Sequence, residues 1–457
     1  MASRGATPRT SQTISPTPPV KASEETAVAT SDTDLDVGKT EKVLSDPESA
    51  VAAAPVSPFG PAPDGGARAW LVAVAAAFAF FSTLGLMNSF GVFQAYYQKH
   101  QLQNETPDRI AWIGSLSACL QFIAGGLTGP IFDRVGVIVL RIGAVLFVFS
   151  VMMTSLCTQY WHFMLAQGVL GGLSASLIQI PSFALVSQYF DKKRAAALGV
   201  VVSGSSVGGI VFPIILSKML NDSTISFAWS VRILGFIIIP FMVFFSVVVK
   251  TRLPPRESQF FIGKAWKEPK YILLVVSIFL ILMGMMTPLF YLPTYAVSRG
   301  MNVTLASYLL AIVNGASTFG RIVPGILADK FGRLNVFGLG ALSTGIVILC
   351  MNTAKDTAGL VLYSIFFGLT SGTIISGQSA ALSICTDQPQ NLGTYIGMGV
   401  AVGSLATLIG PPVNGVLLDK YVGYSQVSIF SGVMCLAGGV VVMFTKFITP
   451  QGLFGRI

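Results

Sequence analysis

The residue in this sequence best placed to do chemistry is an arginine inside an apolar run. Arg321 stands eight residues before Asp329. At 1.5 Å per residue, a helix would place the two about 12 Å apart along its axis. If the run is buried in lipid, a charge at that depth is costly and by default functional. The planar guanidinium suits a carboxylate, so Arg321 is predicted to bind an anion; a structural contact with a nearby helix end or with Asp329 is the alternative.

A second candidate is a charged turn that occurs twice. GPIFDRVG begins at Gly129 and GILADKFGR begins at Gly325, and 325 minus 129 and 329 minus 133 are both 196. Each acid lies just before the next apolar run, where it complements the N-terminal dipole of a helix. The predicted gating residues of these turns are Asp133, Arg134, Asp329, Lys330 and Arg333. We predict a latch that closes one face of the protein; a polar turn without a gating role is the alternative.

The composition indicates where these residues lie. Of 457 residues, 53% are hydrophobic and 11% are charged, against about 25% charged in soluble domains. We therefore predict a membrane protein. The net charge is +9, and residues 1–68 hold six basic and nine acidic residues, which leaves +12 on the remainder.

Apolar runs of about 20 residues, each long enough to span a bilayer as a helix, set the predicted organisation. The twelve runs begin near Ala69, Arg109, Ile138, His162, Ala195, Phe227, Tyr271, Thr304, Leu334, Thr357, Gly393 and Tyr424. The predicted fold is an all-α membrane protein with twelve transmembrane helices in two six-helix pseudo-symmetric halves. The predicted parts are a disordered cytoplasmic tail (1–66), an N-terminal bundle (67–249), a cytoplasmic central loop (250–270), a C-terminal bundle (271–446) and a short cytoplasmic tail (447–457).

The basic residues predict the orientation. The breaks after even-numbered runs, with the C-terminus, hold fifteen Lys and Arg, whereas the breaks after odd-numbered runs hold seven. Excess positive charge marks the cytoplasmic side, so both termini are predicted to be cytoplasmic. The positive charge is then a topology signal and not a footprint of nucleic acid. Three predicted glycosylation sites, Asn104, Asn221 and Asn302, all fall on the opposite side.

In this layout the two turns occupy equivalent places in the two halves, as in transporters built from repeats. The pattern G-x-x-x-D-[RK]-x-G-[RK] resembles the loop motif of the major facilitator superfamily. Asp64-Gly65-Gly66 followed by Trp70, and the stretch from Tyr189 to Gly209, are similar to marks of its monocarboxylate porter branch. The resemblance covers about residues 64–446. It implies two halves that rock around a central site, an arginine at position 321 that engages a carboxylate, and coupling to protons.

Two positions depart from that branch. Ser317 stands where well-studied members carry an Asp, and Asn88 stands where they carry a Lys. Proton coupling therefore rests on the resemblance alone. Pro288 and Pro293 are expected to break or kink the seventh helix, which would place its aromatic residues at the cavity. The predicted substrate-binding residues are Arg321, Asn88, Ser317, Phe290, Tyr291 and Tyr295.

These features predict a secondary active or facilitative transporter of small organic anions, most simply monocarboxylates, in the plasma membrane. An efflux pump for an acidic secondary metabolite is an alternative, and a membrane sensor that does not transport is an alternative of another class. No enzyme, catalytic residue, metal or cofactor is predicted, because paired acids, nucleophile–base pairs and metal-ligand spacings are missing from the apolar runs. The predicted partners are the anion, protons and lipid, with no nucleic acid and no assigned protein.

Overall fold

A computed structural model describes residues 62–105, 107–221, 224–254, 261–386, 388–421 and 423–449. These residues are helices and short connections, with no β-strand among them. Residues 56–457 belong to one compact unit. Most of the predicted N-terminal tail, part of the central loop and most of the C-terminal tail lie outside the described residues.

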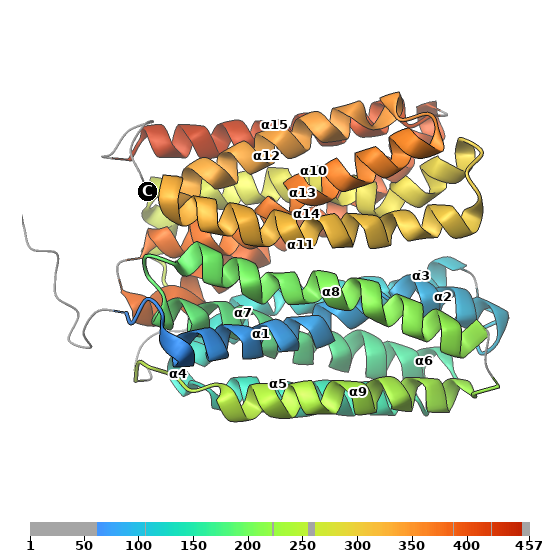
Figure 1. The fold of residues 1–457 in the computed structure, drawn as a ribbon, viewed down its shortest axis with the longest axis horizontal. Coiled ribbons are helices and arrows are strands. Elements are labelled where there is room, and N and C mark those ends of the chain that lie inside the picture. The colour runs from blue at the N-terminus through green and yellow to red at the C-terminus, as the bar shows by residue number, and fades with distance from the viewer. Residues whose placement is uncertain are drawn as a thin grey trace, which may run out of the picture. The chain divides into compact units, whose positions relative to one another are not determined.

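The first six predicted spans are all present as helices (Figure 1). They are α1 (Gly66–Met87) with α2 (Phe90–Lys99), α3 (Pro107–Ile123) with α4 (Gly125–Val135), α5 (Ile138–Thr154), α6 (Tyr160–Phe163) with a π-helix (Met164–Leu170) and α7 (Gly171–Tyr189), α8 (Arg194–Asn221) and α9 (Phe227–Val248).

The last six spans follow a short 3₁₀ helix, Ala265–Lys267. They are α10 (Pro269–Ser298), α11 (Val303–Phe331), α12 (Arg333–Leu349), α13 (Thr357–Leu382), α14 (Leu392–Tyr421) and α15 (Ser425–Phe447), with 3₁₀ turns at Cys350–Thr353, Ser383–Cys385 and Pro389–Asn391.

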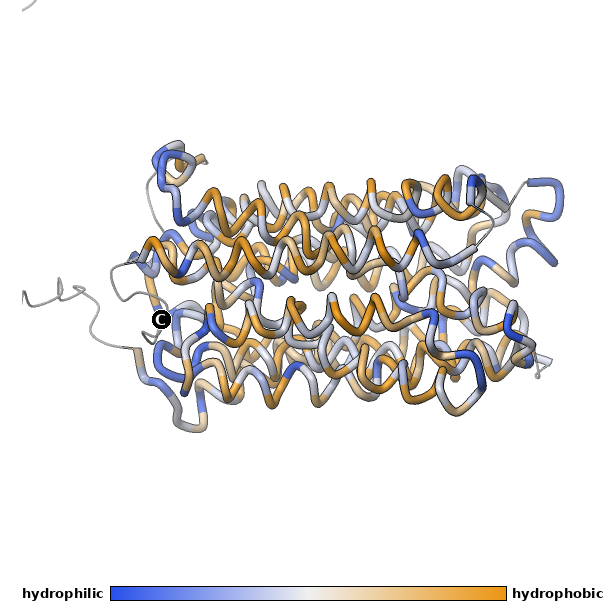
Figure 2. The backbone as a smooth tube through the Cα atoms, turned by 90° about the horizontal axis from the view of Figure 1, so that it is seen from above, coloured by the Kyte–Doolittle hydropathy of each residue, from blue (hydrophilic) through white to orange (hydrophobic). Residues whose placement is uncertain are grey.

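Length and composition support membrane insertion of these helices. Ten stretches of the described chain are long and apolar enough to cross a bilayer, Trp112–Ile123 with Gly125–Val135 forms one further span bent by 44°, and Ile138–Thr154 is a shorter apolar helix. Ten, one and one make the predicted twelve. Figure 2 shows apolar residues along the helices and polar residues mainly at both ends of the bundle. The predicted fold class is confirmed.

The helices pack in two groups, α1–α9 and α10–α15, which are called the first and second helix groups below. Contacts between the groups are made by α8 on α11 and α13, and by α14 on α3, α4 and α7. Within the first group, Gly204 and Gly208 on α8 lie against α1: a Cβ on them would be 2.0 Å from the Ala77 oxygen and 2.3 Å from the Phe81 oxygen. This glycine pair therefore lets α8 and α1 approach closely.

Of the expected break or kink in the seventh span, the break is wrong, because α10 runs as one helix through Pro288 and Pro293. Neighbouring helices and local adjustment can satisfy the carbonyl that a proline leaves without a partner. The irregular backbone lies in the first helix group instead. It comprises the break at Asn88–Ser89, the 44° bend at Ala124 and the π-helix Met164–Leu170.

Candidate functional site

The two charged turns lie at one end of the helix bundle, which is called the turn end here (left in Figure 1). Each acid is in the last turn of its helix, Asp133 on α4 and Asp329 on α11. The following glycines, Gly136 and Gly332, have φ angles of +77° and +99°, a region that favours glycine. From the sequence, each acid was expected to complement the start of the next helix in the chain. In the structure, each carboxylate instead binds the start of a helix in the opposite group.

Asp133 caps a helix of the second group. Its carboxylate accepts the backbone N–H groups of Gly393 at 3.2 Å and Thr394 at 2.7 Å, and the Thr394 hydroxyl at 2.7 Å. Because α14 begins at Leu392, these are the first N–H groups of that helix, which lack partners within it. The negative charge also faces the positive end of the helix dipole. Asp133 thereby joins α4 to α14.

Asp329 makes the reciprocal contact. Its two oxygens accept the backbone N–H groups of Ala195 at 3.0 Å and Ala196 at 2.8 Å, at the start of α8. The Arg333 Nε lies 3.6 Å from the same carboxylate, and the Arg333 guanidinium also donates to the Asp191 carbonyl. Each turn thus holds a helix of the opposite group, so the two groups are closed together at the turn end.

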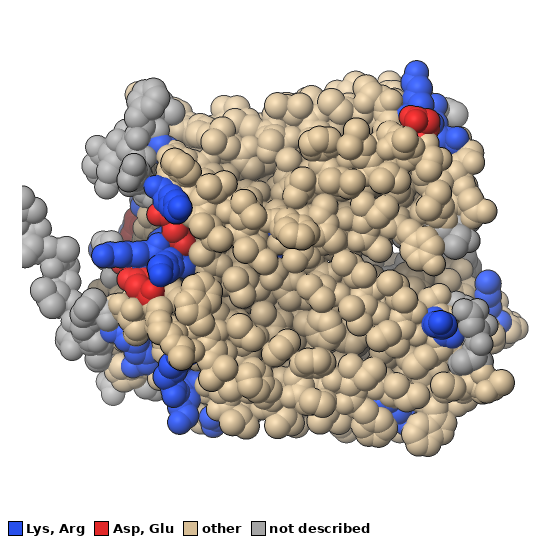
Figure 3. Space-filling model, in the orientation of Figure 1, with Lys and Arg blue, Asp and Glu red and all other residues tan. Residues whose placement is uncertain are grey.

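The other basic residues at the turn end differ in whether they contact the opposite helix group. Arg194 pairs with Asp191 at 3.1 Å and donates to the carbonyl and hydroxyl of Ser383, at 3.4 and 3.3 Å, across the two groups. Sequence reasoning did not assign it. Arg134 and Lys330, both predicted gating residues, are exposed. Figure 3 shows basic and acidic side chains gathered at this end, with an uncharged band between the two ends.

Asp64 is a second residue whose contact sequence reasoning missed. Its carboxylate accepts the backbone N–H groups of Asp191, Lys192 and Lys193 at 2.5, 2.6 and 3.4 Å, and its φ is +51°. The start of α1 is therefore fixed to the loop that leads into α8. The Asp64-Gly65-Gly66 motif was the available signal, but the sequence alone did not show what it touches.

Arg321 crosses the contact between the two groups. It is 4% exposed and donates to the Val202 carbonyl at 2.8 Å and the Ser205 hydroxyl at 2.6 Å, both on α8. Its Nε has no hydrogen-bond partner. The structural partner of Arg321 is therefore the middle of α8, and neither a helix end nor Asp329.

Ser317 and Asn88 occupy different surroundings. Ser317 lies one turn before Arg321, is 2% exposed and has no partner for its hydroxyl. Asn88 is exposed at the break between α1 and α2. A Cβ at Gly209 would lie 2.7 Å from the Asn88 amide nitrogen and 3.2 Å from that of Asn314. Asn88 and Asn314 therefore approach the same point on α8 from the two helix groups.

The three aromatic residues of the seventh span are not gathered at one cavity. Phe290 is 59% exposed. Tyr295 is buried, donates its hydroxyl to the Ala354 carbonyl at 3.0 Å and packs on Tyr424. The Tyr291 hydroxyl would lie 3.3 Å from a Cβ at Gly415. Tyr295 therefore packs within the second helix group, in contrast to its predicted place in the binding site.

The predicted glycosylation sites can be placed only in part. Asn104 and Asn302 are exposed. Asn221 ends α8, and its side chain lies outside the described residues, as do Thr106 and Ser223 of the first two motifs.

Comparisons with known proteins agree with this architecture. The family model described as Major Facilitator Superfamily matches residues 69–333 and 320–453. The chain is 48% identical to the aspyridones efflux protein of Emericella nidulans over 86% of this chain and 80% of that protein. It is 36% identical to the agnestins efflux protein of Paecilomyces divaricatus over 84% and 89%.

Two solved structures share the fold. The Escherichia coli fucose:proton symporter has a TM-score of 0.66 at 15% identity, covering 82% of this chain and 99% of that one. The human organic anion transporter MFSD10 has a TM-score of 0.64 at 15% identity, covering 82% and 98%. Family, relatives and fold agree, and the chain belongs to the Major Facilitator Superfamily of membrane transporters.

Proposed function

We propose that this protein exports an acidic, amphipathic small molecule by alternating access between its two helix groups. The observation that carries the direction is the 48% identity to a protein named for aspyridones efflux, over 86% of this chain. A second relative is named for agnestins efflux. This supports the efflux alternative of the sequence analysis over monocarboxylate uptake. A small molecule is the substrate class that such relatives imply.

The charge of the substrate is inferred from Arg321. Four charged residues of the described chain are buried, namely Asp133, Arg194, Arg321 and Lys446. Asp133 and Arg194 lie at the turn end, and Lys446 is the second-last residue of α15, whereas Arg321 is ten residues before the end of α11. The unpaired Nε, together with NH groups now bound to α8, gives Arg321 the donors for a carboxylate. The proposed binding group is therefore Arg321, with Ser317, Asn88, Phe290 and Tyr291 as proposed neighbours of the ligand.

The structure supports a conformation closed at the turn end. We assign the turn end to the cytosol, from the distribution of basic residues, and the plasma membrane as the location. In the proposed cycle the caps at Asp133 and Asp329 release, the turn end opens, and an anion from the cytosol takes the place of α8 on Arg321. Reclosure of the caps then favours release on the opposite side.

We assign no side chain of this protein to proton coupling. Ser317 and Asn88 are uncharged where the porter branch carries ionisable groups, and the buried acid of the described chain, Asp133, caps α14. A pH gradient is proposed to act through the ionisation of the substrate acid.

The test is directional flux in sealed vesicles. Inside-out and right-side-out plasma-membrane vesicles from cells that express the protein would be given labelled naphthoate, indole-acetate or lactate. We expect accumulation of the larger aromatic acids in inside-out vesicles. Accumulation of lactate alone would favour the monocarboxylate reading. Saturable binding without flux in either vesicle type would favour a sensor and reject a transporter.

A further inference from the structure

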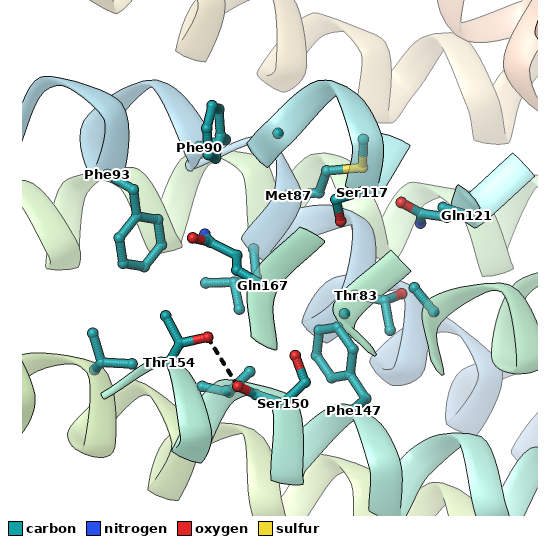
Figure 4. Close-up of a pocket in the computed structure, with 16 residues that line it drawn as sticks. Thr83, Met87, Phe90, Phe93, Ser117, Gln121, Phe147, Ser150, Thr154 and Gln167 are labelled. Atoms are coloured by element: carbon teal, nitrogen blue, oxygen red, sulfur yellow. Dashed lines mark hydrogen bonds between the residues drawn. The ribbon is translucent and has the colours of Figure 1, made fainter. Parts of the chain in front are cut away.

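The first helix group encloses a cavity that plays no part in the contacts described above. Its volume is about 60 Å³, and its lining comes from α1, α2, α3, α5, the π-helix, α7 and α9, all within that group (Figure 4). Neither Arg321 nor any other charged residue lines it. It is therefore separate from the proposed anion site.

The cavity lies where the irregular helices of the first group meet. Met87 and Phe90 flank the break between α1 and α2, Gln121 is three residues before the bend at Ala124, and Gln167 belongs to the π-helix; all four line the cavity. Broken helices line binding sites in transporters, and π-bulges occur often at functional sites. Three irregularities around one cavity are consistent with a site for a ligand.

The polar lining offers hydrogen-bond donors in excess. Gln121 is 1% exposed, and its amide nitrogen has no partner; Figure 4 shows its amide end turned toward Ser117 and the other lining residues. Gln167 accepts the Tyr97 hydroxyl through Oε1 at 2.9 Å, which leaves its NH₂ group as a donor. An unsatisfied buried donor costs roughly 1–3 kcal/mol, so Gln121 requires an acceptor.

The hydroxyl groups of the lining make no hydrogen bond with the Gln121 amide nitrogen in the structure. Thr83, Ser150 and Thr154 donate to the carbonyls of Ala79, Ala166 and Ser150, at 2.8, 2.8 and 2.9 Å. Their protons are used, so these hydroxyl groups could only accept, and none of them accepts from the Gln121 amide nitrogen. The remaining walls include the rings of Phe90, Phe93 and Phe147. The cavity therefore combines spare amide donors with apolar, partly aromatic walls.

A buried polar cluster in the second helix group differs from this cavity, because its polar side chains hydrogen-bond to one another. The Asn414 side-chain amide donates to the Thr287 hydroxyl at 2.6 Å, Thr287 and Ser431 share a hydrogen bond of 2.5 Å, and the Ser431 hydroxyl donates to Asn414 Oδ1 at 3.2 Å. That network satisfies itself and has no spare donor to offer a ligand. The spare amide donor of Gln121 lies in the first helix group.

We propose that the cavity of the first helix group binds an uncharged carbonyl group of the transported molecule, with Gln121 as its hydrogen-bond donor. A carbonyl only accepts, and its carbon substituents suit the aromatic walls. The volume fits a group of about four or five non-hydrogen atoms, since one water needs about 10–15 Å³. That the carbonyl belongs to an exported molecule rests on the proposed function; carbonyl binding by the cavity does not.

The position of the cavity fits such a role. Asn88, between the lining residues Met87 and Phe90, approaches Gly209 and thereby the contact with the second helix group. For the two sites to hold one molecule, the α1–α2 break must rearrange so that the cavity connects with the contact between the groups. A substrate could then place its anionic end at Arg321 and a neutral carbonyl in this cavity.

The test uses 2-butanone, a five-atom ketone, and the full-length protein in lipid nanodiscs, with binding followed by saturation-transfer difference NMR. Gln121→Leu removes the donor. The matched control is Gln179→Leu, because Gln179 is 2% exposed, also has an amide nitrogen without a partner, and does not line the cavity. Ser117→Leu fills the cavity from α3 and keeps both glutamines in the sequence.

We expect saturable binding of butanone to the unaltered protein and to Gln179→Leu. The dissociation constant of Gln121→Leu should be about three- to tenfold higher, because this variant loses one net hydrogen bond to the ligand. Ser117→Leu should abolish binding. Thermal unfolding identifies a variant that fails to fold, and Gln121→Leu should unfold no lower than the unaltered protein. Equal affinity of the two glutamine variants, or no saturable binding to the unaltered protein, would overturn the proposal and leave a cavity filled by water. Failure of flux with intact butanone binding would reject the transport function alone.

Discussion

Asp133 and Asp329, 196 positions apart, make the same contact in opposite directions. Asp133 on α4 accepts the first N–H groups of α14, and Asp329 on α11 accepts the first N–H groups of α8. Each helix group thus supplies one acid and one helix start. Because both contacts join the two groups at the turn end, opening there must break both, and both must form again on closure.

Removing the charge of either capping acid is predicted to favour the state that is open at the turn end. Asp133→Asn and Asp329→Asn keep a carbonyl acceptor but remove the charge that faces a helix dipole, worth about 0.3–2 kcal/mol each. Each variant should shift the conformational equilibrium toward the state open at the turn end, by roughly two- to thirtyfold by that estimate. Hydrogen exchange of the Ala195, Ala196, Gly393 and Thr394 amides measures this. Lys355→Gln, at an exposed position between α12 and α13, is the control, and protection as strong as in the control would contradict the latch.

Arg321 is predicted to set anion affinity. Arg321→Ala should weaken binding of a labelled aromatic carboxylate by at least tenfold, because a charge-assisted hydrogen bond contributes about 1.5–3 kcal/mol. Arg321→Lys keeps the charge but loses the planar fork, so an intermediate affinity is expected. Arg232→Ala is the control, because Arg232 contacts Ser155 and Trp229 within the first helix group. Binding by Arg321→Ala equal to this control would reject Arg321 as the anion site.

The sequence predicted the twelve spans and the paired turns well, because apolar run length and a repeated charged motif are local patterns. It could not predict which helix each acid caps. Asp133 and Thr394 are 261 positions apart in the chain, and no periodicity connects them. The same holds for Asp64, whose motif was recognised while its contact with the loop at Asp191–Lys193 was not.

A helix break was predicted at α10 and is found elsewhere, for a physical reason. Proline removes one backbone donor, which is visible in the sequence, but α10 continues through two prolines. The break at Asn88–Ser89 and the π-helix of Met164–Leu170 carry no proline. These features, and the cavity they surround, depend on packing among helices that are distant in the chain.

Asp64 is predicted to support the closed turn end from the start of α1. Asp64→Ala removes three hydrogen bonds to the backbone of residues 191–193, in the loop whose Asp191 also binds Arg194 and Arg333. We expect faster hydrogen exchange in residues 191–196 and a state more often open at the turn end. Asp64→Asn should retain most of the protection, because the acceptor remains. Unchanged exchange in Asp64→Ala would show that the loop holds its position without the carboxylate.

Two glycines in close contact with the backbone of a neighbouring helix predict two different effects of one added methyl group. A Cβ at Gly129 would lie 2.1 Å from the Gly393 oxygen, across the two groups, and a Cβ at Gly204 would lie 2.0 Å from the Ala77 oxygen, within one group. Gly129→Ala should therefore prevent closure of the turn end, with a small change in unfolding temperature. Gly204→Ala should lower the unfolding temperature. Thermal unfolding and thiol labelling of a cysteine placed at the turn end separate the two. The same loss of stability in both variants would mean that closure is not what Gly129 permits.

Two cysteines at the end opposite the turns predict a labelling pattern that also tests the topology. Cys350 is exposed, whereas Cys157 is 6% exposed and burial raises the pKa of its thiol to about 11. The reactive form is the thiolate, so at pH 7.5 a raised pKa keeps Cys157 protonated and slow to react.

A membrane-impermeant maleimide added outside intact cells should label Cys350 and spare Cys157. Cys350→Ser should abolish this labelling, while Cys157→Ser should leave it unchanged. Labelling of Cys350 only after permeabilisation would reverse the proposed orientation, and rapid labelling of Cys157 would show that the connection between α5 and α6 opens readily.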